Sequence, residues 1–150
     1  RVSNAVNITL MDTLLGANGA SGIHINRAAG EDALSVRLLR VNTTSHFYSP
    51  AIQIETVEGK NGKEEGAIDF LLDDAHVYDN GRGGLAVEEM EDDSQIRIMR
   101  SSFLRNAGPS LHFSSHSRMA LLIEKNLFSQ NSARTAFKDD SVLVVSVLDG

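Results

Sequence analysis

The chain has 150 residues, enough for one domain with a sizeable core and too few for two ordinary domains. Its net charge is -6 and its basic residues are scattered, so nucleic acid is not an expected partner, and no apolar stretch approaches the roughly 20 residues that membrane insertion requires. The absence of cysteine excludes a disulfide framework and cysteine-based zinc sites.

A six-position pattern of five apolar residues and one asparagine recurs along the chain. In chain order, its three full copies are Ile8, Leu10, Leu15, Asn18, Ile23 and Ile25; Phe70, Leu72, Val77, Asn80, Leu85 and Val87; and Ile96, Ile98, Phe103, Asn106, Leu111 and Phe113. A looser copy opens with Val36 and Leu38, closes with Ile52 and Ile54, and has no Asn at the expected place. A later copy keeps Leu121, Ile123, Phe128, Asn131 and Ala136 before Lys138 replaces the last apolar residue, and Val142, Val144 and Val147 begin a further copy.

Each copy contains two apolar-x-apolar stretches and a third short apolar stretch, the period-2 pattern of strands with one buried face. Each unit is therefore predicted to form three short strands. One such coil cannot bury its apolar side chains alone, but coils stacked about 4.8 Å apart share a continuous core. An antiparallel sandwich would also show alternation, but it gives no reason for Asn to recur at a fixed offset. Residues 57–66 are charged and rich in glycine, which predicts an inserted surface loop.

The units resemble the repeats of right-handed parallel β-helix proteins of the pectate-lyase-like superfamily. In that pattern a small residue precedes one strand, as Gly22, Ala51, Gly84 and Ser110 do here, and two turns favour Asn, which Asn126 matches at the first turn and Asn18, Asn80, Asn106 and Asn131 at the second. The resemblance implies an all-β fold, a right-handed single-stranded parallel β-helix of about five coils over residues 1–150. It implies no one activity, because the fold hosts lyases, hydrolases, epimerases, adhesins and scaffolds.

The recurring Asn residues could form a row of ligands or a structural ladder. We predict the structural role, because an Asn amide can bond its own turn and the next coil. By the same reasoning Phe103 and Phe128 are expected to stack in the core, and Phe70 and Phe113 to lie there too, rather than to bind sugars.

Candidate binding residues point outward from the strand that follows each small residue. They form two rows across the coils: His24, Gln53 and His112 in one, and Asn26, Glu55, Glu88 and Ser114 in the other. The resemblance implies a sugar-binding groove over this strand. Glu55 and Glu88 occupy equivalent positions in consecutive coils, and two such carboxylates repel unless a cation or a proton intervenes. The resemblance implies acidic clusters with Ca²⁺ or paired carboxylates at this place, so Glu55 and Glu88 are the candidate catalytic residues and the candidate ligands of a calcium ion.

Two classes of function remain open. The first is a structural, adhesion or carbohydrate-binding module of a larger protein. The second is a polysaccharide lyase or glycoside hydrolase, and it is disfavoured because the sequence shows no complete catalytic set. The sequons at Asn7 and Asn42 are predicted glycosylation sites and, with the fold, favour an extracellular or cell-surface location. Neither end supplies an evident cap, so we expect the chain to be a segment of a longer protein, with neighbouring coils or domains as partners and end-to-end association when it is isolated.

Overall fold

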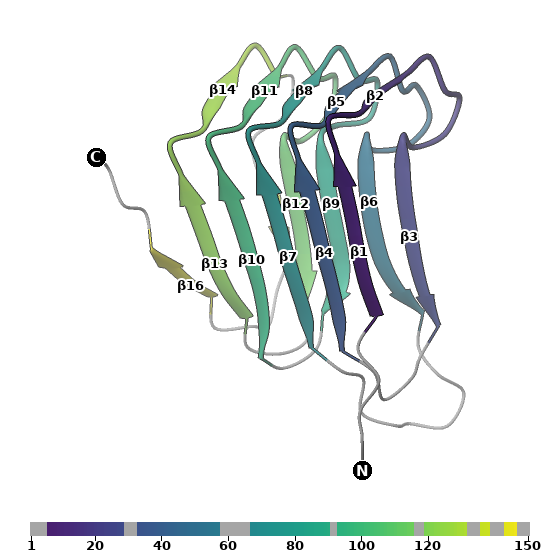
Figure 1. The fold of residues 1–150 in the computed structure, drawn as a ribbon. Helices are drawn as coiled ribbons and strands as arrows, with labels where there is room; N and C mark the ends of the chain where they lie inside the picture. Colours follow the sequence, from purple (N-terminus) through teal and green to yellow (C-terminus); the bar gives the residue numbers. More distant parts are fainter. Residues whose placement is uncertain are drawn as a thin grey trace.

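The structure, a computed structural model, describes residues 6–28, 33–57, 67–90, 93–115, 119–131, 136–138 and 143–146. Within these ranges all regular structure is β-strand, arranged in three parallel sheets (Figure 1). Sheet A contains β1 (Val6–Met11), β4 (Leu34–Leu39), β7 (Ile68–Asp73), β10 (Ser94–Met99), β13 (Met119–Glu124) and β16 (Leu143–Ser146). Sheet B contains β2 (Leu14–Gly16), β5 (Asn42–Thr44), β8 (His76–Tyr78), β11 (Ser102–Leu104) and β14 (Leu127–Ser129). Sheet C contains β3 (Ile23–Ala28), β6 (Ile52–Val57), β9 (Leu85–Met90), β12 (Leu111–Ser115) and β15 (Ala136–Lys138).

The chain visits sheets A, B and C in turn and then returns to sheet A one strand further along. It makes four complete turns between β1 and β13, and β14, β15 and β16 continue the same path. The prediction of an all-β parallel solenoid with three short strands per coil is therefore confirmed, whereas the right hand implied by the resemblance stays a prediction. Residues 58–66 of the predicted inserted loop lie outside the described residues.

The core lies between the three sheets and is built from the inward-facing residues of each strand. In the middle coils the predicted apolar positions are almost completely buried: Val36, Leu38, Ile52, Ile54, Phe70, Leu72, Val77, Leu85, Val87, Ile96, Ile98, Phe103, Leu111 and Phe113. Phe103 and Phe128 stack in adjacent coils with ring centroids 5.2 Å apart and an interplanar angle of 13°. The aromatic residues of the repeat therefore pack inside the solenoid, as predicted, although Phe128 remains 41% exposed.

The strand register explains the copy that lacks Asn. Thr43 pairs with both Leu15 and Val77, so it occupies a core position that is apolar in the neighbouring coils. His46 stands where those coils have Asn, because its backbone N–H donates to Oδ1 of Asn80 just as the N–H of Asn80 donates to Oδ1 of Asn106. The second coil therefore keeps the backbone pattern with two unusual side chains.

Two predicted registers near the C-terminus are wrong by one residue. Ala136 pairs with His112, and Phe137 pairs with Phe113, so Lys138 does not replace the last apolar residue. Similarly, Val145 pairs with the inward-facing Leu121, while Val144 pairs with Ala120; Val142 and Val147 lie outside the described residues. The apolar runs there contain more than one alternating set, and period 2 alone does not choose between them.

The recurring Asn residues form the predicted structural ladder. Nδ2 of Asn80 donates to Oδ1 of Asn106 at 2.9 Å, and Nδ2 of Asn106 donates to Oδ1 of Asn131 at 3.0 Å. Nδ2 of Asn106 also reaches the carbonyl of Val77 at 3.0 Å, one coil earlier. Asn18, at the same repeat position in the first coil, is exposed. The ladder therefore satisfies buried turn groups and leaves no row of amides free for a ligand.

Each corner between sheets A and B, and each turn after sheet B, contains one non-glycine residue with left-handed backbone. These residues are Asp12, Arg40, Asp74, Arg100 and Lys125 in the first row and Ala17, Ser45, Asp79, Arg105 and Gln130 in the second. Several of them are joined by ion pairs between coils. Hydrogen bonds from Arg40 hold the pKa of Asp12 below its usual value, and hydrogen bonds from Arg105 do the same for Asp79.

From the sequence, Asn7 is expected just outside a strand and Asn42 in an irregular turn, both exposed, but the structure places both on strands. Asn7 is in β1 and exposed, and Asn42 is the first residue of β5 and half-buried. The error at Asn42 has the same cause as the weak second repeat: polar Thr43 occupies a core position, so the apolar pattern of a strand is missing there. Glycosylation of either residue stays a prediction.

The first coil exposes apolar side chains next to strands that have a sheet neighbour on one side only. Val6 is 50% exposed and Leu14 is 67% exposed, while β1, β2 and β3 each end their sheet within the described part of the chain. Such strands accept further strands readily. We therefore expect the isolated chain to associate through this coil, which light scattering would detect, and the double change Val6→Lys with Leu14→Lys to restore a monomer. A wild-type chain that stays monomeric at high concentration would contradict this prediction.

Candidate functional site

The outward face of sheet C brings the predicted binding residues of four coils together. The register aligns His24, Gln53, Ala86 and His112 in one row across β3, β6, β9 and β12, and it aligns Asn26, Glu55 and Glu88 in the next row. Inward residues such as Ile54 and Val87 anchor these strands in the core. The repeat therefore fixes the site, because alternation on a buried strand turns every second side chain outward.

Glu55 is the centre of a continuous hydrogen-bonded set. Its Oε1 accepts hydrogen bonds from Nε2 of His24 at 2.7 Å and from Nδ2 of Asn26 at 3.1 Å. Its Oε2 accepts one from Nε2 of Gln53 at 3.3 Å, and Oε1 of Gln53 accepts one from the hydroxyl of Ser21 at 3.3 Å. The Glu55 side chain is 27% exposed, so one side of the carboxylate is held by three donors while part of it faces solvent.

Glu88 contacts a histidine on the other side along the solenoid from the one that Glu55 binds. Its Oε1 lies 3.8 Å from Nε2 of His112, in the coil that follows, whereas Glu55 binds His24 in the coil that precedes it. The two carboxylates thus lean away from each other although their backbones are paired. Like charges on neighbouring strands repel. Here each of the two glutamates contacts a different histidine.

Ser114 is not in the register predicted for it. Phe113 pairs with Val87, but Ser115 pairs with Met90, so β9 has one extra residue between these points. A β-bulge therefore places Glu88 and Glu89 opposite the single residue Ser114. Bulges of this kind redirect side chains, and the predicted row of Asn26, Glu55, Glu88 and Ser114 is regular only as far as Glu88.

The calcium site predicted at Glu55 and Glu88 stays a prediction. In the part of the chain that the structure describes, no group of three or more His, Asp or Glu residues is arranged to hold a metal ion. The groups that surround Glu55 are nitrogen donors, which stabilise a carboxylate without a cation.

An exposed aromatic pair beside this face was missed by the sequence analysis. Phe47 and Tyr48 are 58% and 78% exposed in the segment that leads into β6. The backbone N–H of Tyr48 donates to the carbonyl of Gly19, and a Cβ on Gly19 would lie 3.7 Å from the Tyr48 ring. The signal was present in the sequence, because this turn carries His-Phe-Tyr where the three full copies have Asn followed directly by Gly or Ala.

No family model, curated protein or solved structure gives a significant match to this chain. None of the described segments forms a helix that is long and apolar enough to cross a membrane. The geometry of the site is therefore the basis for any functional conclusion.

Proposed function

We propose that the chain is a carbohydrate-binding module of the β-solenoid class, and that the outward face of sheet C binds a glycan. The observation that carries the proposal is the hydrogen-bonded set around Glu55, which joins β3 and β6. Sugar hydroxyls both donate and accept hydrogen bonds, and His, Asn, Gln and Glu side chains on rigid strands provide both functions in fixed positions.

The repeat spacing also suits a polymeric ligand. Neighbouring strands in a sheet lie about 4.8 Å apart, so the face offers similar polar groups at regular intervals along the solenoid. The exposed ring of Tyr48 adds an apolar surface at the beginning of β6, and exposed aromatic rings with a polar tip are common at binding surfaces. These features support an elongated glycan that crosses several coils.

The proposal includes the setting of the module. We place it outside the cell or on the cell surface, within a larger protein that uses neighbouring coils or domains, where adhesion or a structural role accompanies glycan binding. The sequons at Asn7 and Asn42 and the partly exposed first coil support this setting. Neither feature depends on the sheet C face.

Binding to immobilised polysaccharides and a glycan array tests the proposed face. The change Glu55→Gln keeps the size of the side chain but removes the charge that holds three donors, so we expect affinity for the bound glycan to fall by about tenfold or more. Glu124→Gln is the matched control, because Glu124 lies on sheet A and contacts Lys125. Equal affinity of both variants and the wild type would contradict the proposal, as would a complete lack of glycan binding.

A second candidate, a polysaccharide lyase or glycoside hydrolase, is favoured by one contact. Nε2 of His24 lies 2.7 Å from Oε1 of Glu55. A histidine whose ring is oriented by a carboxylate can act as a general base. The polysaccharides of the panel should be assayed for unsaturated products and new reducing ends, with and without Ca²⁺. Turnover that is lost in Glu88→Gln or Glu55→Gln would replace the binding proposal with the enzymatic one.

A further inference from the structure

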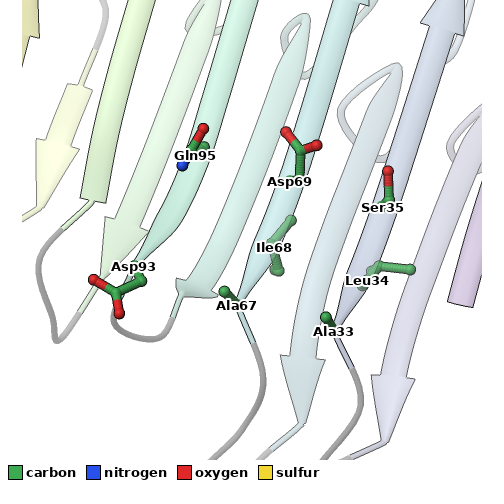
Figure 2. Close-up of a pocket in the computed structure, with 8 residues that line it drawn as sticks. All are labelled: Ala33, Leu34, Ser35, Ala67, Ile68, Asp69, Asp93 and Gln95. Carbon is green, nitrogen blue, oxygen red and sulfur yellow. The ribbon is translucent and has the colours of Figure 1, made fainter. Parts of the chain in front are cut away.

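A cavity of about 240 Å³ opens on the outer face of sheet A, away from the proposed glycan face on sheet C. Figure 2 shows that it lies where β4, β7 and β10 begin, and that Ser35, Asp69 and Gln95 project side by side from these strands. The register places these three residues in one row. The cavity therefore crosses three coils and is a product of the repeat.

The residues just before this row explain why the surface is hollow. Ala33 and Ala67 precede the buried Leu34 and Ile68, and their short side chains leave space below the row of longer polar residues. Asp93 takes the equivalent position in the next coil and lines the cavity at the side where β10 begins. The result is a small apolar floor with polar groups on its rim.

The charge of the cavity is negative. Asp69 is already paired, because its Oδ1 accepts a hydrogen bond from Nη2 of Arg97 at 2.7 Å. Asp93 is exposed, and within the described part of the chain it has no ion-pair partner. One carboxylate of the two that line the cavity is therefore available to a ligand, together with the hydroxyl of Ser35 and the amide of Gln95.

We propose that this cavity binds a primary ammonium group carried by a sugar ring, that is, an amino sugar. The ammonium group would pair with Asp93, the ring would lie over Ala33 and Ala67, and the ring hydroxyls would exchange hydrogen bonds with Ser35 and Gln95. A lysine side chain also carries an ammonium group, but its alkyl stem would leave Ser35 and Gln95 without partners, which the composition of the rim disfavours.

Nuclear magnetic resonance titration of the 150-residue chain tests this site directly. Glucosamine should produce saturable shifts at the amides of Ser35, Asp69 and Gln95, whereas neutral N-acetylglucosamine should not, and added salt should weaken the effect. Asp93→Asn should weaken glucosamine binding by about tenfold or more, because a charge-assisted hydrogen bond is lost. Ala67→Leu should fill the cavity and abolish the shifts.

Two variants serve as matched controls. Asp74→Asn, like Asp93→Asn, changes an exposed aspartate with left-handed backbone, and Ala107→Leu enlarges an exposed alanine in the turn after sheet B. Both should bind glucosamine as the wild type does. The proposal is overturned if glucosamine gives no saturable shifts, if N-acetylglucosamine binds equally well, if Asp93→Asn has no effect, or if Nα-acetyl-lysine binds as tightly as glucosamine. None of these outcomes depends on glycan binding at sheet C.

Discussion

Replacing Asn106 by alanine will lower the free energy of unfolding by about 3–5 kcal/mol, because two buried groups lose their acceptor at once. Oδ1 of Asn106 accepts hydrogen bonds from the backbone N–H of Asn80 at 3.1 Å and from its Nδ2 at 2.9 Å. Asn106 is completely buried, so water cannot replace the lost oxygen without entering the corner. Equilibrium unfolding in urea, followed by circular dichroism, will measure the loss.

The first coil provides the control for this prediction. Asn18 occupies the same position of the repeat, but it is exposed, and Asn18→Ala should change the free energy of unfolding by less than about 0.5 kcal/mol. A similar loss of unfolding free energy in both variants would mean that Asn stabilises the turn by its own backbone preference and not by the hydrogen bonds between coils. A negligible loss in Asn106→Ala would show that the ladder does not hold the coils together.

The fold could be predicted from the sequence because its main determinant is repeated. The full copies in the middle coils place apolar residues where the structure buries them, as Phe70 and Ile96 show in consecutive strands of sheet A. A signal that recurs at a fixed spacing tolerates errors in single copies. The second coil shows the limit of this method. Thr43 by itself does not indicate a core strand, and His46 by itself does not indicate a position of the Asn ladder.

The corners could not be predicted in the same way. Left-handed backbone is expected at Gly or Asn, but the structure places Arg40, Arg100 and Lys125 there. Their backbone is set by the stacking of coils, because the N–H of Arg40 donates to the carbonyl of Asp73 and the N–H of Arg100 to that of Glu124. Tertiary contacts thus override local preference at these turns.

A charge pattern between two coils was available in the sequence but was not used. Three aspartates of the third coil contact three arginines of the fourth, at separations of 26 to 28 residues: Asp69 with Arg97, Asp73 with Arg100, and Asp79 with Arg105. Once the repeat is aligned, these pairs follow from position alone. Each pair is partly exposed and contributes at most about 1 kcal/mol, but together they favour this order of coils.

The candidate site was predictable as a set of positions and not as a set of contacts. Alternation places Glu55 and Glu88 on the outward face, and the structure confirms that they are neighbours. Their opposite directions depend on His24 and His112, which belong to different coils, and the position of Ser114 depends on a bulge. An alignment of the repeats predicts neither the side-chain rotamers of the two glutamates nor the extra residue of β9 at the bulge.

His46 is the buried residue that fits its repeat position least well. Its side chain is completely buried, its Nδ1 lies 3.2 Å from the carbonyl of Ala20, and its Nε2 has no partner among the described residues. The ring points at Gly22, where an added Cβ would lie 2.5 Å from Nε2. The imidazole is therefore accommodated because the neighbouring residue is glycine.

Gly22→Ala should consequently lower the free energy of unfolding by about 2–3 kcal/mol, because the new methyl group overlaps the imidazole of a packed corner. The adjacent coils show how the clash can be removed. Ala51 is equivalent to Gly22 and Asn80 is equivalent to His46, so alanine and asparagine already coexist at these two positions. The second change His46→Asn should therefore rescue Gly22→Ala, although His46→Asn alone should alter stability by about 1 kcal/mol or less, since the ladder gains an amide while the ring contacts are lost.

A double-mutant cycle in urea measures this coupling. If the alanine methyl group and the imidazole compete for one space, the two changes together should cost about 2 kcal/mol less than the sum of the single changes. Additive effects would mean that Gly22 is required for its backbone and not for the volume of its neighbour. Because both residues lie beside the segment that carries Phe47 and Tyr48, a coupled result would also show that the packing of this turn, next to the proposed glycan face, depends on the pair.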